Sequence, residues 1–586
     1  MKKIYGVVVL MFLCIVSYAQ MGLPSTYCAF ENDVTDTTVQ VSSSSSCFVA
    51  NINNPNGTKF KPFSNQPVIY VRINLIFLQR DNGTGNFQEN SAEHQIFFDE
   101  VIDELNYTYA NLVSPNDGHD VVCNRTVDFI PNTKIQFIVN KIYWQDSYGW
   151  DNLNNPDKVQ CPGDDYPGWH LDYIDNQIIN DPSIPRGINI YFTENSNHYH
   201  HIVELQDSVN YFGATYACSQ FPDYSQYGRT SKIHMPDVYS KYWWMKNVYS
   251  TNSGLSWSNQ VREWSVTEIG KCLAHEIGHS LSLTHPNTSC LNVSVAEIMN
   301  NSAVLRNYFS SLEIGKMYAS LSVSNVRTFV PNSTYLGVKT IRDIEQQRYN
   351  TRLYHSLNIA DTASLTVTCN MIMPSESEIE VHGSLIINNA NITSVGGGWK
   401  GIRVKSNGYL EITSSNISDY DIFVENGGNI LINNGVFVSG NHNITVSSGG
   451  FICLPSGTVL NLINTKSVLR LSKGAYYGIS STAHGSGTSS PTPSSCGSLS
   501  ITVINGEGSI IRDIADVYIQ NQTIEDERYI GGKKIYVGEQ VTNTQSYGPV
   551  LMQNNADVIL DGEEIIFLPG FTIEGGASLE IKNMEE

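Results

Sequence analysis

A loose repeat of 20–25 residues in the C-terminal half of this 586-residue chain constrains its fold more than any other feature. Each unit reads as a turn, a short alternating strand, a polar corner and a second short strand. The units begin at Gly383, Gly408, Gly428 and Gly449. Because a coil of this size covers its apolar face only by stacking on the next coil, the repeat predicts an all-β parallel β-helix or solenoid over residues 374–477. A β-sandwich, with turns at shorter intervals, is the alternative.

The preceding region, residues 67–330, mixes strand and helix patterns. Runs of alternating β-branched residues predict strands, and apolar residues at helical spacing behind a Ser cap predict a helix. A second helical pattern comes late in the region. Strand, helix, strand, strand and a late helix together indicate an α/β domain with a mixed sheet. The expected elements are strands at 68–79, 133–144 and 187–194 and helices at 91–112 and 263–285.

The first 19 residues have the pattern of a secretory signal peptide. Lys2 and Lys3 precede a mostly apolar run over residues 4–16, and the small residues Ser17 and Ala19 stand before the expected cleavage site. The run is too short to span a membrane comfortably, and no later run reaches the ~20 apolar residues that a transmembrane helix needs. We therefore expect a secreted or cell-surface protein with no transmembrane segment.

Composition and charge narrow the classes of partner. The chain has 56 acidic and 35 basic residues, a formal net charge of −21 and no Lys/Arg cluster, so we expect no nucleic-acid binding. Charged residues make up only 16%, which is typical of secreted β-rich proteins. The cysteines that follow the expected cleavage site are even in number, which permits disulfide bonds, although buried free thiols are the alternative.

These patterns divide the chain into seven segments. We expect a signal peptide at 1–19, an irregular N-terminal segment or pro-region at 20–66, the α/β domain at 67–330, a linker at 331–373, the β-helix-like repeats at 374–477, a linker loop at 478–498 and a C-terminal β-rich region at 499–586. The tail of the last segment resembles the short β-rich repeats that close many exported bacterial proteins.

The strongest chemical signal is the sequence HEIGHSLSLTH at residues 275–285. On a helix, His275 and His279 are four residues apart and project from one face, so that both imidazoles can bind one zinc ion. Glu276 is one position round, where its carboxylate can lie beside the open coordination position without binding the metal. Three protein nitrogens leave the fourth position to water, as a catalytic zinc site requires.

A third ligand, His285, requires the chain to leave the helix soon after His279. We expect the helix to end after Leu281 or Ser282, and Pro286 agrees with a break at this point. The simpler alternative is a helix with surface histidines and a capping glutamate. Three histidines and a glutamate in this register arise only rarely by chance.

This motif resembles that of the metzincin metallopeptidases, whose pattern is HExxHxxGxxH followed by a Met-turn. Downstream, VAEIMNNSAVLRNYFSSLEIGKMYASL at residues 295–321 resembles the Met-turn and C-terminal helix of the pappalysin-like (cytophagalysin) family. The resemblance implies that Met299 packs beneath the zinc-binding imidazoles without binding the metal. It covers roughly residues 67–330.

Upstream, YFGATYACSQFP at residues 211–222 is similar to the edge strand of the same family, and SKIHMPDVYS is similar to the strand that follows it. The resemblance implies that an extended substrate pairs with this edge by strand addition. The residues that would line the cleft are Gly213, Ala214, Thr215, Tyr216 and Ala217.

Two positions depart from the family pattern. Ser282 stands in place of the glycine, whose left-handed turn costs an L-residue about 1–2 kcal/mol, so we expect strain there. Asn301 stands where many relatives carry a tyrosine that is thought to hydrogen-bond the reacting oxyanion. The amide of Asn301, or Tyr308 approaching from elsewhere, would take this role.

The resemblance implies an exported zinc-dependent endopeptidase that acts on protein or peptide substrates. Glu276 would take a proton from the attacking water and deliver it to the leaving amine. The alternative is a carbohydrate- or surface-binding β-helix protein with a weakened or inactive peptidase domain, and a polysaccharide lyase is a third hypothesis. The C-terminal β-region would serve as a stalk, an attachment or a targeting module, with glycan or cell-surface contacts.

Two weaker clusters carry further hypotheses. Loop histidines indicate either a second metal site or, more simply, solvated side chains. A group of aspartates could bind calcium, although it lacks the spacing of a calcium-binding loop. The members are His198, His200 and His201 in the first cluster and Asp151, Asp157, Asp164 and Asp165 in the second.

Overall fold

The chain forms two compact units. Residues 68–331 make up most of the first unit, and residues 332–586 make up most of the second. The computed structural model describes residues 47, 59–114, 121–122, 125–126, 128–153, 169–193, 218–219, 232–236, 238–250, 254–285, 297–300, 306–332, 335, 337–395, 398–418, 421–433, 435–438, 443–447, 449–453, 459–462, 468–471, 476–477, 502–504, 517–525, 527–543 and 546–583. We call the first compact unit the α/β unit and the second compact unit the β unit.

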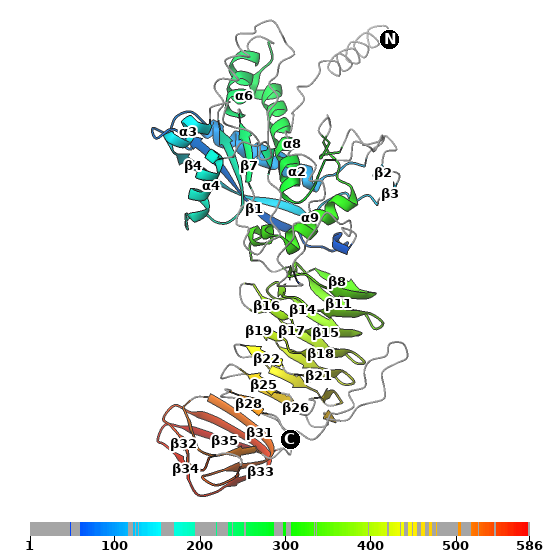
Figure 1. Cartoon of the computed structure of the whole chain (residues 1–586), viewed down its shortest axis with the longest axis vertical. Coiled ribbons are helices and arrows are strands. Elements are labelled where there is room, and N and C mark those ends of the chain that lie inside the picture. The colour runs from blue at the N-terminus through cyan, green and yellow to red at the C-terminus, as the bar shows by residue number, and fades with distance from the viewer. Residues whose placement is uncertain are drawn as a thin grey trace, which may run out of the picture. The chain divides into compact units, whose positions relative to one another are not determined.

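A five-stranded sheet of order β4-β1-β5-β7-β6 forms the centre of the α/β unit (Figure 1). The first four strands in this order are parallel, and β6 pairs antiparallel with β7 at the edge. The bounds are β1 (Ile69–Gln79), β4 (Ile135–Gln145), β5 (Ile188–Thr193), β6 (Cys218–Ser219) and β7 (Lys232–Pro236), with a separate pair, β2 (Val121–Val122) and β3 (Arg125–Thr126).

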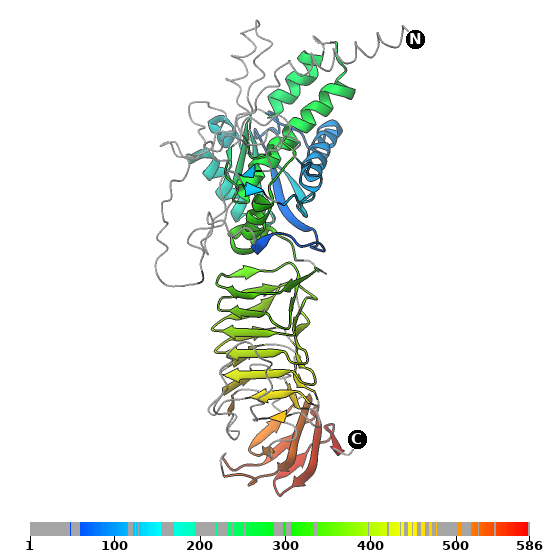
Figure 2. The same ribbon diagram turned by 90° about the vertical axis from the view of Figure 1, so that its right-hand side faces the viewer.

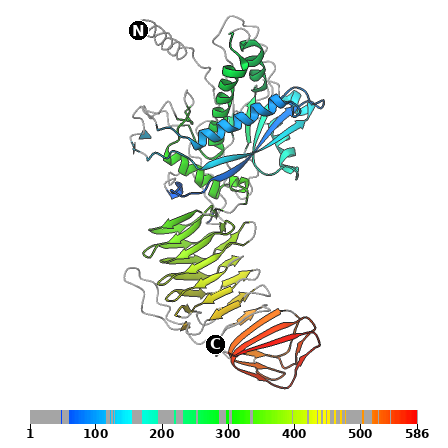
Figure 3. The ribbon, with the colours of Figure 1, turned by 180° about the vertical axis from the view of Figure 1, so that it is seen from behind.

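Helices cover both faces of this sheet. On one face, Phe77 of β1 packs edge-on against Phe98 of α2, and α2 also contacts α8 (Figure 3). On the other face, Ile76 and Leu78 pack against α3 and α4, because neighbouring strand residues point to opposite sides. The bounds are α2 (Ala92–Ala110), α3 (Ser147–Leu153), α4 (Trp169–Asn180), α6 (Val238–Trp244), the π-helices η2 (Met245–Tyr249) and η3 (Trp257–Val261), α8 (Arg262–Ser280), α9 (Ser311–Val323) and the 3-10 helix η4 (Asn325–Phe329).

The predicted strands and helices of this unit are confirmed, with boundaries that differ by a few residues at most positions. The hydroxyl of Ser91 caps α2 by accepting a hydrogen bond from the backbone N–H of His94. Of the apolar residues at helical spacing in α2, Phe97, Val101 and Leu105 are buried as expected, whereas Ile96, expected on the same face, is 49% exposed. The late helix, α8, ends at Ser280 rather than continuing to residue 285.

Three seven-stranded parallel sheets make up most of the β unit (Figure 2). Each strand pairs with the third strand before it and the third after it, an arrangement compatible with the stacked coils that the repeat predicts. The first sheet contains β8 (Val338–Ile341), β11 (Ser356–Ile359), β14 (Glu378–Val381), β17 (Gly401–Val404), β20 (Ile422–Val424), β23 (Asn443–Val446) and β26 (Val468–Leu471). The second contains β9 (Ile344–Gln347), β12 (Ser364–Val367), β15 (Ser384–Asn388), β18 (Tyr409–Thr413), β21 (Asn429–Asn433), β24 (Phe451–Cys453) and β27 (Tyr476–Tyr477). The third contains β10 (Thr351–Arg352), β13 (Met371–Met373), β16 (Asn391–Ser394), β19 (Asn416–Ser418), β22 (Gly435–Val438), β25 (Val459–Leu462) and β28 (Thr502–Ile504).

The glycines that begin the repeat lie at a corner between sheets. The carbonyl of Gly383 accepts a hydrogen bond of 2.8 Å from Tyr409, and the carbonyl of Gly408 accepts one of 2.9 Å from Asn429. A Cβ atom at Gly408 would lie 2.1 Å from the carbonyl oxygen of Val381. Backbone therefore packs on backbone at this corner, which explains why the sequence repeats glycine there.

The parallel sheets extend beyond both ends of the predicted repeats. Residues 338–373, most of the expected linker, form β8–β13, and β28 follows the expected linker loop at 478–498, which lies outside the described residues. The early strands lack a glycine at each corner, so the sequence repeat does not register there. Apolar residues of these strands, such as Leu357 and Ile359, belong to the same core as the later ones.

Two smaller parallel sheets follow at the C-terminal end, in agreement with the expected β-rich region. Their core contains Ile535, Val550 and Val558. One sheet contains β29 (Val517–Ile519), β31 (Glu527–Val537), β33 (Asp557–Phe567) and β35 (Ser578–Asn583), and the other contains β30 (Gln522–Ile524), β32 (Val550–Met552) and β34 (Phe571–Ile573).

The cysteines are of both expected kinds. Cys47 forms a disulfide with Cys369, with the two Cα atoms 5.6 Å apart, and so ties part of the N-terminal segment to the β unit. Cys453 is also disulfide-bonded, whereas Cys272 in α8 is a buried free thiol. Within the described ranges, none of the helices has the length and apolar character needed to cross a membrane.

Candidate metal centre

Helix α8 carries His275 and His279 one turn apart, with both imidazoles fully buried. The helix ends at Ser280, and Leu281 forms its C-cap. The backbone N–H of Leu283 then donates to the carbonyl of Gly278, which folds the chain back beneath the last turn. This early end of the helix brings the third histidine, His285, to the other two.

The turn that follows α8 depends on a left-handed residue. Ser282 has φ 75°, the region in which an L-residue is strained and glycine is not. The expectation of strain at the position of the family's glycine is therefore confirmed. The strain does not prevent His285 from reaching the other two histidines.

We expect a Ser282→Gly variant to be more stable than a Ser282→Ala variant by about 1 kcal/mol. Both variants lack the hydroxyl, so their difference isolates the cost of a Cβ atom in the left-handed region, reduced by the greater unfolded-state entropy of glycine. Thermal unfolding of the two metal-free proteins measures this difference. A higher unfolding temperature for the Ala variant would contradict the assignment of strain to Ser282.

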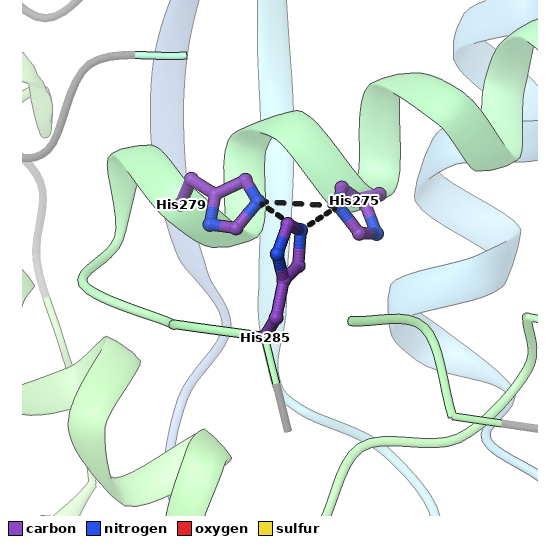
Figure 4. A group of neighbouring side chains, drawn as sticks. All are labelled: His275, His279 and His285. Carbon is purple, nitrogen blue, oxygen red and sulfur yellow. Dashed lines mark hydrogen bonds between the residues drawn. The ribbon is translucent and has the colours of Figure 1, made fainter. Parts of the chain in front are cut away.

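The three imidazoles converge on one point (Figure 4). The Nε2 atoms of His275, His279 and His285 lie 3.1 Å from one another in all three pairs. The centre of such a triangle lies about 1.8 Å from each nitrogen, so a single ion at the ~2.0–2.1 Å of a zinc–nitrogen bond can contact all three. In the described part of the chain, this is the group of side chains that could hold a metal ion.

Backbone carbonyls set the protonation of two of these rings. The Nδ1 atom of His275 lies 2.6 Å from the carbonyl oxygen of Ile298, and that of His279 lies 2.7 Å from the carbonyl oxygen of Leu283. In a neutral imidazole each Nδ1–H donates to its carbonyl, so that Nε2 carries a lone pair. The lone pairs of His275 and His279 then face each other at 3.1 Å, and a shared cation relieves their repulsion.

The electrostatic surroundings keep these rings neutral. Burial, and then the neighbouring charges of His279, Arg306 and His285, lowers the pKa of His275 well below its usual value. Burial, and then His285, lowers the pKa of His279 to about 3. Metal ligation requires neutral imidazoles, so the residues present fit a bound metal ion.

Glu276 follows His275 on α8 and is 1% exposed. A buried carboxylate that follows a converging imidazole on the same helix could exchange a proton with a group bound at the centre. That the carboxylate of Glu276 lies beside the metal position stays a prediction.

Met299 is fully buried and packs against the helix that carries the histidines. A Cβ atom at Gly278 would lie 2.5 Å from its sulfur, so the absence of a side chain at Gly278 makes room for Met299. The adjacent Ile298 carbonyl accepts the hydrogen bond from His275. This segment therefore supports the ring of His275 through the Ile298 carbonyl, and the packing of Met299 beneath the imidazoles stays a prediction.

The segment that carries Met299 is fixed by a pair of carboxyl groups. Burial, and then the charge and hydrogen bond of Glu313, raises the pKa of Glu297 to about 11. Glu297 is therefore protonated at neutral pH and donates its proton to Glu313. Glu313 also completes the capping box of α9 with Ser310, so one proton links the segment to the start of α9.

We expect a Glu297→Gln variant to lose much of the pH dependence of stability between pH 6 and 8. Because the pKa of Glu297 is raised in the folded state, the stability from the protonated form is complete below the ordinary glutamate pKa of 4.5 and is lost as the pH rises toward about 11. The wild-type loss should be on the order of 1 kcal/mol per pH unit. Unfolding temperatures measured across this range test the expectation, and equal slopes for both proteins would contradict it.

Several residues named in the sequence analysis lie outside the described residues. They are Gly213, Ala214, Thr215, Tyr216, Ala217 and Asn301 of the expected substrate and oxyanion sites, His198, His200 and His201 of the loop cluster, and Asp157, Asp164 and Asp165 of the expected calcium site. Asp151 is described and is exposed at the end of α3, so calcium binding stays a prediction. The two residues after Ala217 form the edge strand β6.

Tyr308 is described and is 3% exposed. Its carbonyl oxygen accepts a 2.9 Å hydrogen bond from the N–H of Ile298, and its ring stacks on Phe129 with centroids 6.3 Å apart. Tyr308 thus supports the Met299 segment through its backbone. A role for its hydroxyl in binding an oxyanion stays a prediction.

Sequence reasoning missed the groups that support the three histidines. The carbonyls of Ile298 and Leu283 have no signature in the sequence, because any residue supplies a carbonyl. Glu297 and Arg306 did leave a signal, since each is a charged residue in the segment around Met299 that the motif does not account for.

No protein-family model matches the sequence, and no curated protein is similar to it.

Proposed function

We propose that this chain is an exported zinc-dependent endopeptidase in which His275, His279 and His285 bind zinc. The observation that carries the proposal is the convergence of three Nε2 atoms at 3.1 Å, two of them held in the metal-binding tautomer by backbone carbonyls. Three nitrogens leave one position of a tetrahedral site open, which is typical of catalytic and not of structural zinc sites.

Glu276 would act as the general base and acid. Zinc in such a site supplies Lewis acidity, which lowers the pKa of a water molecule and polarises a carbonyl group. The Glu276 carboxylate would accept a proton from the attacking water and pass it to the leaving amine. Its burial favours this role, because a carboxylate shielded from solvent exchanges its proton with the reacting groups and not with bulk water.

The sheet edge supports an extended peptide as substrate. Strand β6 is the last strand in the order of the α/β sheet, so among the described strands it pairs only with β7. A peptide can add to such an edge through backbone hydrogen bonds. We propose that the preceding segment, Gly213–Ala217, aligns the substrate there.

We also propose a family for the α/β unit, a parallel β-helix for the β unit, and export of the protein. The helix with HExxH, the turn after it and the buried methionine support a metzincin-like domain of the pappalysin-like family. The third-strand pairing of the three sheets supports a parallel β-helix. The N-terminal sequence supports export, and the β unit would act as a stalk or attachment module with glycan or cell-surface contacts.

Cleavage of casein and gelatin by the full chain tests the proposed activity. We expect cleavage to stop when the metal is removed with 1,10-phenanthroline and to return when zinc is added. Cleavage that persists in metal-free protein would contradict the proposal. A zinc-loaded protein that cleaves none of a broad peptide set would favour a carbohydrate- or surface-binding protein with an inactive peptidase domain.

A further inference from the structure

Arg306 is a buried cation that is neither a proposed metal ligand nor the proposed general base. Its side chain is 4% exposed, and its Nη1 atom is buried with no hydrogen-bond partner among the described residues. Two other cations of the α/β unit that are largely buried have acidic neighbours: Lys271 on α8 is countered by Glu104, and Lys241 pairs with Glu268. Arg306 differs from these two in its unpartnered nitrogen.

A guanidinium at this depth with a nitrogen that has no partner among the described residues is costly. Arginine does not lose its proton in proteins, so burial cannot be relieved by neutralisation. A buried ion without a partner loses its hydration and gains no compensating interaction. The backbone adds strain, because Arg306 has φ 41°, in the left-handed region. Such a cost persists where a ligand supplies the missing partner.

The position of Arg306 ties it to the metal centre. It lies two residues before Tyr308, whose carbonyl holds Ile298, and Ile298 in turn accepts the hydrogen bond from His275. The charge of Arg306 acts on the imidazoles of both His275 and His279. The guanidinium therefore lies within electrostatic range of these two imidazoles, on the segment that supports His275.

The ligand that matches this environment is an anion. With a metal ion at the three histidines, the ion and Arg306 together carry more positive charge than the buried acid Glu276 can balance. The planar fork of arginine is complementary to a carboxylate, which can accept two parallel hydrogen bonds. A peptide carries carboxylates in two places, on Asp and Glu side chains and at its C-terminus.

We propose that Arg306 binds a carboxylate of the peptide substrate and so makes the protein prefer substrates with an acidic group beside the cleaved bond. This inference rests on the proposed peptidase function. In this account Arg306 is a specificity-determining residue that contacts the substrate and takes no part in the proton transfers of Glu276.

Matched peptides test the preference in the full-length zinc-loaded protein. One pair carries Glu or Gln beside the cleaved bond with both termini blocked, and a second pair of short peptides has a free or an amidated C-terminus. We expect kcat/KM to favour the acidic member of one pair by roughly 10- to 100-fold. The pair that shows the preference identifies the source of the carboxylate.

Variants assign the preference to Arg306. We expect the ratio of kcat/KM values to fall toward 1 in Arg306→Gln and to take an intermediate value in Arg306→Lys, which keeps the charge but loses the fork. The control is Arg186→Gln, because Arg186 is exposed in the same unit, and it should keep the wild-type ratio. If Arg306→Gln does not fold, the Lys variant decides. A wild-type protein without acidic preference, or a preference that survives in these variants, would overturn the inference.

A binding measurement separates this inference from the proposed activity. Calorimetry with chelator-treated, metal-free protein measures the affinity of the same blocked peptides without cleavage. We expect the Glu peptide to bind roughly 10- to 100-fold more tightly than the Gln peptide, and Arg306→Gln to remove the difference. If the wild type cleaves nothing yet shows this difference, the inference stands and the proposed activity fails. Equal affinities for both peptides would overturn the inference even in an active peptidase.

Discussion

Replacement of Glu276 by Gln is expected to lower kcat/KM for peptide cleavage by roughly 10²- to 10⁴-fold while the protein keeps one bound zinc ion. The Gln side chain has nearly the same shape and fills the same buried position, so the fold and the three histidines should be unaffected. It cannot accept a proton from water, and the base that the reaction needs is lost. Steady-state cleavage of a fluorogenic peptide, together with metal analysis of the same sample, measures both quantities.

A second glutamate on α8 provides the control for this variant. Glu263 lies in the first turn of the helix and is exposed, and Glu263→Gln should retain wild-type cleavage. Loss of zinc from Glu276→Gln would show that Glu276 maintains the metal site and not the proton transfer. Wild-type cleavage by Glu276→Gln would remove the general base from the account.

Replacement of His279 by Ala is expected to weaken zinc binding by more than about 100-fold and to abolish cleavage. His279 is fully buried and supplies one of the three converging nitrogens, so its loss leaves two ligands and a cavity. In the wild type, zinc at 100 times its dissociation constant should stabilise the metal-free protein by about 2.7 kcal/mol. The variant should show no such rise in unfolding temperature.

His234 is a suitable control for the loss of a buried imidazole. It lies on β7 with Nε2 2.7 Å from the hydroxyl of Thr193, and burial lowers its pKa to about 4. His234→Gln should keep the zinc-dependent rise in unfolding temperature even if the protein itself is less stable. A rise of equal size in His279→Ala would contradict the role of His279 as a ligand.

The sequence predicted those parts of the centre that depend on helical spacing. His275 and His279 are brought together by a single turn of α8, so their spacing was enough to place them on one face. His285 can reach the other two histidines only if the helix ends soon after His279. The spacing of the motif required such an end but did not explain it. The reason lies in the turn at Ser282 and in the hydrogen bond from Leu283 to Gly278.

The groups around the histidines depended on contacts between distant segments, and no local pattern predicted them. The carbonyl of Ile298 reaches His275 across 23 residues of chain. Glu297 acquires its proton only because Glu313 lies against it in a buried environment. The burial of Arg306, likewise, follows from how its segment packs and not from its neighbours in the sequence.

In the β unit the sequence predicted the stacking but not its extent. Glycine repeats where backbone contacts backbone, as at Gly408. The coils with such corners are therefore recognisable in the sequence. The strands β8–β13 have residues other than glycine at their corners, so the glycine repeat does not extend to them and the sequence predicts a linker there. Apolar residues alternate in these strands as in the later ones, for example at Leu357 and Ile359. This alternation was the available sign of stacking in that part of the sequence, and it is weaker than the glycine repeat.

The central claim is that three imidazoles hold a single zinc ion. Anomalous diffraction from crystals of the full zinc-loaded chain, collected on both sides of the zinc absorption edge, tests it most directly. We expect one peak at about 2.0–2.1 Å from the Nε2 atoms of His275, His279 and His285. Zinc-loaded protein with no peak at these nitrogens, or with a peak bound by other residues, would contradict the claim.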